Sequence, residues 1–145
     1  MTSTATFSCQ VGTTDPTASL GMEIWLDNKK IFDQDHVNEN VKISHEFSDD
    51  EAEHELRFVM KNKTQEHTQI DESEQIIKDA CLTVSDVAFD EIDLGHMFVK
   101  QTVYTHSFNG GSPLTEQEFF GTMGCNGQVA MRFTTPIYMW LLENM

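Results

Sequence analysis

The residues of this sequence that are able to do chemistry are mainly carboxylates and histidines. The 145 residues include 24 Asp and Glu, six His and three Cys. Nucleophilic catalysis needs a Ser, Cys or Thr beside an activating base, yet the sequence has neither a GxSxG elbow nor a patterned Cys–His pair. The histidines form neither HExxH nor HxH. These patterns predict a protein that is not an enzyme.

The acidic residues favour solvated loops over a catalytic carboxylate pair. They gather in turn-like runs such as 49–51 (DDE) and 90–93 (DEID), where neighbouring charges repel each other and gain little from burial. Calcium is the stronger alternative, because it takes six to eight oxygen ligands and loops at a sheet edge are able to supply them. The candidate metal ligands are Asp86, Asp90 and Asp93, or else Asp27, Asp33 and Asp35. No EF-hand spacing is present in the sequence.

Aromatic residues on a polar face suggest sugar binding, since an exposed ring offers a stacking platform. Trp25 alternates with the apolar residues of its segment, and Tyr104 stands two residues before His106. These three residues are the candidate ligand-binding residues. The alternative for Trp25 is packing under a loop or against a second subunit.

The C-terminal segment is the most apolar run of the chain. Its candidate partner-docking residues are Ile137, Tyr138, Trp140, Leu141 and Leu142. Such a run is too apolar to lie free in water. It either closes one end of its own core or docks on a neighbouring chain.

The formal net charge of −15 disfavours two classes of partner. A strongly acidic surface repels the phosphates of nucleic acids and the head groups of anionic membranes. The sequence starts without a secretory signal and has no run near the ~18 apolar residues of a membrane span. Its odd number of cysteines suits synthesis in a reducing cytoplasm without a disulfide framework.

Alternating apolar and polar residues predict strands at several points of the chain. The segments with this period are 20–26, 41–47, 56–60, 82–84 and 129–133. Residues 29–32 are expected to return from a hairpin as a second strand, and the β-branched and aromatic run 98–108 also predicts a strand. Asp27-Asn28 predicts a tight hairpin, and Asn126-Gly127 predicts a type I′ turn. Thr115 and Glu118 resemble a capping box and predict a helical turn over 115–120. The segment after Pro136 is expected to be a short helix or an extended tail.

Many short strands without a long helical pattern predict an all-β fold with at most short helices. We expect an antiparallel β-sandwich, of jelly-roll or carbohydrate-binding-module type, that forms a single domain over residues 1–145. Residues 1–19 are expected to be an arm or edge strand, and residues 136–145 an apolar C-terminal segment.

Three segments also resemble small proteins of marine tailed phages, the cyanophages in particular. They are 22–27 (MEIWLD), 53–63 (EHELRFVMKNK) and 135–144 (TPIYMWLLEN). The resemblance implies a virion component, such as a capsid decoration, fibre or tail protein, made in the host cytoplasm and bound to other virion proteins or to itself. A second resemblance, to calcium-dependent carbohydrate-binding modules, implies recognition of host surface glycans.

Overall fold

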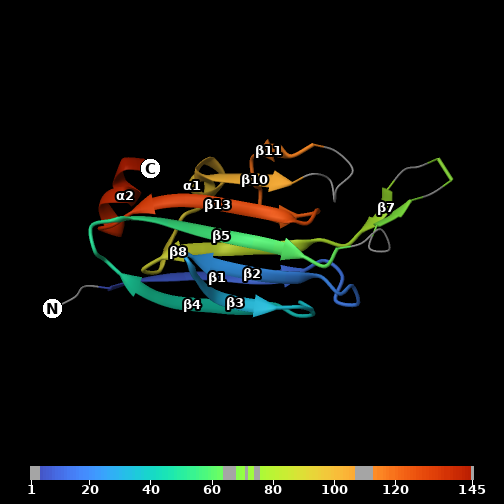
Figure 1. Cartoon of the computed structure of the whole chain (residues 1–145), viewed down its shortest axis with the longest axis horizontal. Coiled ribbons are helices and arrows are strands. Elements are labelled where there is room, and N and C mark those ends of the chain that lie inside the picture. The colour runs from blue at the N-terminus through green and yellow to red at the C-terminus, as the bar shows by residue number, and fades with distance from the viewer. Residues whose placement is uncertain (1–3, 64–67, 71, 74–75, 107–112, 145) are drawn as a thin grey trace.

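The alternating segments form two antiparallel sheets that pack face to face (Figure 1). The computed structural model describes residues 4–63, 68–70, 72–73, 76–106 and 113–144. The first sheet has the order β12 (Thr122–Met123), β8 (Leu82–Phe89), β1 (Thr4–Thr13) and β4 (Val41–Ser48), and β9 (Ile92–Asp93) pairs with β8. The second sheet has the order β11 (Thr115–Gln117), β10 (Thr102–His106), β13 (Gly127–Thr134), β5 (Glu53–Lys61), β2 (Gly21–Leu26) and β3 (Lys29–Gln34). The prediction of an all-β sandwich is confirmed.

Three further elements lie outside these two sheets. They are the ribbon of β6 (Thr68–Ile70) with β7 (Ile76–Asp79), the helix α1 (His96–Gln101) and the helix α2 (Ile137–Asn144). The ribbon extends beyond one end of the sheets, whereas α2 lies at the opposite end (Figure 1). Neither helix of the described ranges has the length and apolarity required to cross a membrane.

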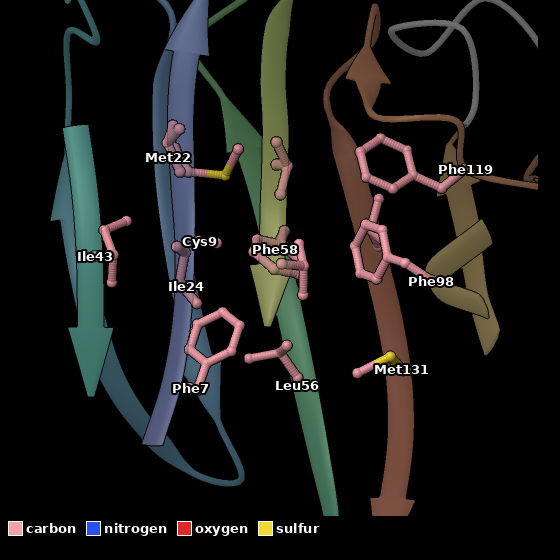
Figure 2. Close-up of a cluster of buried hydrophobic side chains, with 14 of the residues drawn as sticks. Phe7, Cys9, Met22, Ile24, Ile43, Leu56, Phe58, Phe98, Phe119 and Met131 are labelled. Atoms are coloured by element: carbon pink, nitrogen blue, oxygen red, sulfur yellow. The ribbon is translucent and has the colours of Figure 1, made fainter. Parts of the chain in front are cut away.

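The core lies between the sheets, because the inward side chains of every second strand residue meet there. Phe7 and Cys9 of β1 face Ile24 of β2 and Phe58 of β5 (Figure 2). The Phe7 and Phe58 rings are in edge contact across the sheets, with centroids 6.2 Å apart. Burial of these large side chains is the main term that stabilises the two-layer arrangement.

The predicted segments 20–26, 29–32, 41–47, 56–60 and 129–133 are all strands, and the Asp27-Asn28 hairpin is confirmed. The prediction of one strand over 98–108 is wrong, because α1 occupies its beginning and β10 starts only at Thr102. Phe98 of α1 contacts Phe58 and Phe119, at centroid distances of 6.1 Å and 5.8 Å. The apolar residues therefore fill the core from a helix, and this packing overrides the local β preference.

Two turn predictions are also wrong. Thr115 begins the strand β11, which pairs with the open side of β10, because ladder hydrogen bonds outweigh an isolated capping box. Gly127 starts β13 rather than completing a hairpin turn. A Cβ atom at Gly127 would lie 2.4 Å from the carbonyl oxygen of Thr105, so the glycine permits close pairing with β10.

Candidate functional site

Trp25 lies half-buried on the outward face of the second sheet, among charged side chains. Lys30 Nζ and the Arg57 guanidinium carbon lie over the indole, 5.4 Å and 5.3 Å from the ring centroid. The indole Nε1 donates a hydrogen bond to Glu23 Oε1 over 2.9 Å. Cation–π contacts thus already engage the ring that the sequence offered for sugar stacking. The glycan-binding role of Trp25 stays a prediction.

The acids near the first hairpin surround a lysine. Lys61 Nζ lies 2.7 Å from Asp33 Oδ1, 2.9 Å from Asp35 Oδ1 and 3.1 Å from Glu23 Oε2. The hydrogen bonds from Lys61 hold the pKa of Glu23 and of Asp33 below the ordinary carboxyl values. Hydrogen bonds to Asp33 and Asp35 in turn raise the pKa of Lys61. An ammonium group therefore lies beside Asp33 and Asp35, two of the three acids suggested for calcium, and calcium binding by this set stays a prediction.

Replacing Lys61 with Gln is expected to raise the pKa of Asp33 and of Glu23 toward their ordinary values, because their main hydrogen-bond donor loses its charge. Carboxyl carbon shifts in an NMR titration measure both values. Lys42→Gln, an exposed substitution on the other sheet, is the control and should leave them unchanged. An Asp33 pKa that is the same in both variants contradicts the role assigned to Lys61.

Two of the other calcium candidates accept hydrogen bonds from backbone amides. Asp90 Oδ1 accepts a hydrogen bond from the Thr6 amide over 2.8 Å, and Asp93 Oδ1 accepts one from the Gly95 amide over 2.6 Å. Asp86 has a left-handed backbone with φ of 53°. Across the described ranges, no three His, Cys, Asp or Glu side chains gather in a metal-holding group. Calcium binding by Asp86, Asp90 and Asp93 stays a prediction.

The prediction of an exposed platform at Tyr104 and His106 is wrong, because each residue is only 3% exposed. Both side chains point inward from β10, and the Tyr104 ring contacts Phe119 at a centroid distance of 5.8 Å. The Tyr104 hydroxyl donates a hydrogen bond to the Cys125 carbonyl and accepts one from the Cys125 amide over 3.0 Å. Tyr104 therefore fastens the segment that enters β13.

Replacing Tyr104 with Phe is expected to lower the free energy of unfolding by about 1–3 kcal/mol, because two partly buried backbone groups of Cys125 lose a partner. Chemical denaturation followed by circular dichroism measures the change. The control is Tyr138→Phe, since the Tyr138 side chain is 59% exposed and should change stability by less than about 0.5 kcal/mol. Equal stabilities of the two variants contradict this structural role.

A buried histidine that the sequence analysis did not single out bridges two carboxylates. His54 Nδ1 lies 2.8 Å from Asp27 Oδ2, and His54 Nε2 lies 2.8 Å from Asp50 Oδ1. The imidazole is 8% exposed and stacks on Phe133 with centroids 5.4 Å apart. The sequence did indicate that this histidine is buried, because His54 stands two residues before Leu56 and therefore shares the inward face of β5.

The two carboxylates decide the charge of His54. Burial lowers the pKa of the imidazole, but the hydrogen bonds to Asp27 and Asp50 outweigh burial and the net pKa is raised. The hydrogen bond from His54 lowers the pKa of Asp50. Because a carboxylate engages each ring nitrogen, neither nitrogen is free to take a proton from a ligand. The geometry suits a clamp between the first hairpin and the 49–52 turn.

A groove of about 590 Å³ passes beside this clamp, between the β2–β3 turn and the end of β4. Asp27, Lys29, His45 and Glu46 contribute charged or titratable groups to its wall. The acids of the clamp face this groove with about half of their surface exposed, since the Asp27 and Asp50 side chains are each 46% exposed. The clamp is therefore in contact with solvent.

The C-terminal segment is a helix that divides into a buried and an exposed face. Ile137, Trp140 and Leu141 are buried and belong to the core cluster. Trp140 contacts Phe89 of the first sheet and Phe133 of the second, each at a centroid distance of 6.1 Å. These three of the five predicted docking residues thus close the core of their own chain.

The opposite face of α2 presents apolar side chains to solvent. Tyr138, Met139 and Leu142 are 59%, 47% and 69% exposed. Residues three and four positions apart share one side of a helix, so Leu142 lies beside both Tyr138 and Met139. We call these three residues the α2 face. Two of them, Tyr138 and Leu142, are predicted docking residues that remain exposed among the described residues.

A hollow of about 290 Å³ adjoins α2, where β9, α1 and α2 meet. Its lining includes Ile92, Leu94, Met97 and Leu141, and Ile92 is itself 49% exposed. The rest of its lining is polar and consists of Asp93, His96, Lys100 and Asn144, so this hollow is a mixed surface beside α2 and not part of the α2 face. Comparisons of the whole chain with protein-family models, with curated proteins and with solved structures returned no match.

Proposed function

We propose that this chain is a non-enzymatic assembly module that docks on another protein through the α2 face. Tyr138, Met139 and Leu142 carry this proposal, because they are large apolar side chains that remain in water on a helix whose other face is anchored in the core. Apolar surface of this kind marks protein interaction sites when it is contiguous. The rigid attachment of α2 through Trp140 reduces the ordering cost of binding.

The assembly that we propose is a phage virion, in which the chain is a capsid decoration, fibre or tail accessory protein. The resemblance of 22–27, 53–63 and 135–144 to small cyanophage proteins supports this assignment, and the third of these segments contains the α2 face. The net charge of −15 favours solubility before assembly. The proposed partners are other virion proteins, and the proposed location is the virion after synthesis in the host cytoplasm.

Purified virions test the proposal through a matched pair of variants. Leu142→Ser removes an apolar side chain from the α2 face, and Leu114→Ser removes one that is 76% exposed elsewhere on the surface. A phage that encodes this chain is propagated with each variant, and the chain is quantified in purified particles by mass spectrometry. We expect Leu142→Ser to reduce incorporation at least tenfold, whereas Leu114→Ser is incorporated like the unaltered chain.

Two results oppose the proposal, and each opposes a different part. Particles that lack the unaltered chain contradict the virion assignment. Particles that take up Leu142→Ser as well as the unaltered chain contradict docking through the α2 face. Both variants are checked for unchanged circular dichroism, so that misfolding is separated from lost docking.

A further inference from the structure

The strand orders of the two packed sheets end in four strands, β12 and β4 in the first and β11 and β3 in the second, which differ in how well they are protected from pairing with another strand. β11 and β12 are only three and two residues long. β3 begins with two lysines, and a register shift interrupts its pairing with β2. Short length, lysines and bulges are devices that block an edge.

β4 has few of these devices. It runs for eight residues in unbroken register with β1, from Val41 opposite Val11 to Ser48 opposite Thr4. It contains no proline and one lysine, and its other side has no neighbouring strand among the described residues. Figure 1 shows β4 along the lower margin of the molecule. Its free backbone groups therefore form a long, regular template for another strand.

Symmetry restricts how β4 is able to pair with a copy of itself. Alternate residues of β4 direct their backbone groups to β1, so only every second residue has free groups. When two copies of β4 pair antiparallel around a two-fold axis, each residue faces one residue of the other copy. The residue numbers of every such facing pair have the same sum. That sum must be even, because only then do residues with free groups face each other. The axis consequently passes through a residue, not between two residues.

The outward side chains of β4 favour one of these centres. With the axis at Ser44, Lys42 lies opposite Glu46 of the second copy, and this charge pair occurs twice in the dimer. An axis at Ile43 places Lys42 opposite Ser44, and an axis at His45 places Glu46 opposite Ser44. Opposite charges on facing residues stabilise a strand pair, and like charges destabilise it.

The two charges of β4 are also available for such pairing. Lys42 and Glu46 are both exposed, and neither has an ion-pair partner in the described part of the chain. Lys30, Arg57 and Lys61, by contrast, are each engaged by acids of their own chain. The strand is thus neutral and self-complementary on a molecule whose surface is otherwise strongly acidic.

We infer that β4 pairs with β4 of a second copy of this chain, antiparallel and centred on Ser44, so that the first sheets of two copies join into one continuous sheet. The pairing residues are 41–47. On the core-facing side, Ile43 lies opposite His45 of the second copy and Val41 lies opposite its Phe47. This contact is made by the strand β4 and not by the helix α2, and it does not depend on incorporation into a virion.

Charge variants test both the dimer and its register. Lys42→Glu places an acid opposite Glu46 of the other copy at both ends of the pair. Glu46→Lys places a lysine opposite Lys42 of the other copy at the same two positions. We expect each single variant to weaken the dimer by roughly tenfold or more. An equimolar mixture of the two variants restores opposite charges at both positions, and is expected to form a heterodimer. Light scattering and sedimentation velocity measure the mass, and two different tags report mixed pairs.

Three measurements decide the outcome. An unaltered chain that stays monomeric at micromolar concentration overturns the inference, as does a Lys42→Glu variant that dimerises like the unaltered chain. Single variants that are monomeric but do not associate when mixed overturn the Ser44-centred register.

Lys100→Glu, at an exposed lysine of α1, makes the same change in net charge as Lys42→Glu and should leave the dimer intact. Leu142→Ser should also dimerise, so failure of the proposed α2 docking is distinguished from failure of the β4 pair.

Discussion

Replacing Trp140 with Ala is expected to lower the free energy of unfolding by about 3–5 kcal/mol, the usual cost of removing a large buried aromatic side chain. The indole is 5% exposed and contacts Phe89 and Phe133, one ring from each sheet. Its loss opens a cavity at the end of the core and frees α2. Chemical denaturation monitored by circular dichroism measures the change.

Leu142→Ala is the matched control, since it truncates a neighbouring side chain on the exposed face of the same helix. Its stability should stay within about 0.5 kcal/mol of the unaltered chain. A loss of stability as large as that of Trp140→Ala would show that Leu142 is covered by the chain itself. That result would also remove the basis for partner docking through the α2 face.

Stability is expected to have a maximum on the acid side of neutrality because of the Asp27–His54–Asp50 clamp. The pKa of His54 is raised in the folded state, so its contribution is fully present below about pH 6.5 and is lost as pH rises through the raised value. The pKa of Asp50 is lowered. Its contribution is present above the ordinary carboxyl value and is lost as pH falls through the lowered value. The most stable window lies between about pH 4 and pH 6.5.

The His54→Phe variant separates the charge of the clamp from its packing, because a phenyl ring is still able to stack on Phe133. At about pH 5 this variant should be less stable by about 1.5–3 kcal/mol, through loss of hydrogen bonds to charged groups. The difference should shrink as pH rises through the pKa of His54. Urea denaturation at a series of pH values measures it.

His96→Gln provides the control for the pH series, since His96 is an exposed histidine of α1. The control should retain the decline in stability on the alkaline side. If His54→Phe retains the same decline as His96→Gln, the alkaline limb does not arise from the clamp. If His54→Phe is as stable as the unaltered chain at every pH, the bridge contributes nothing to the fold.

The strands were predictable where one face of a segment is apolar and the other polar. Leu56, Phe58 and Met60 alternate with half-buried residues of the outward face and form the inward face of β5. The first hairpin was predictable from Asp27-Asn28, because both residue types tolerate the backbone of tight turns. These features depend on neighbours within a few positions in the sequence.

The candidate sites were predictable only in part, because burial depends on contacts between distant segments. Trp25 was correctly placed on the outward face of its strand, but Lys30 and Arg57 cover its ring. Tyr104 is buried because Cys125 and Phe119 lie next to it. In the C-terminal segment the run 137–142 marked the right residues. The sequence left open whether these residues close the core of their own chain or dock on a neighbouring chain. In the structure three of them face the core, and the others are exposed.

The sequence by itself determined the two-layer β architecture of this protein, since period-two alternation of apolar residues requires sheets with one buried face. Only the tertiary structure decided where His54, Trp140 and the edge of β4 lie. His54 meets Asp27 across 27 positions, and Trp140 meets two sheets at once. The physical reason is range: side-chain alternation is a local property, whereas strand order, ion pairs and the covering of apolar faces depend on which distant segments come together.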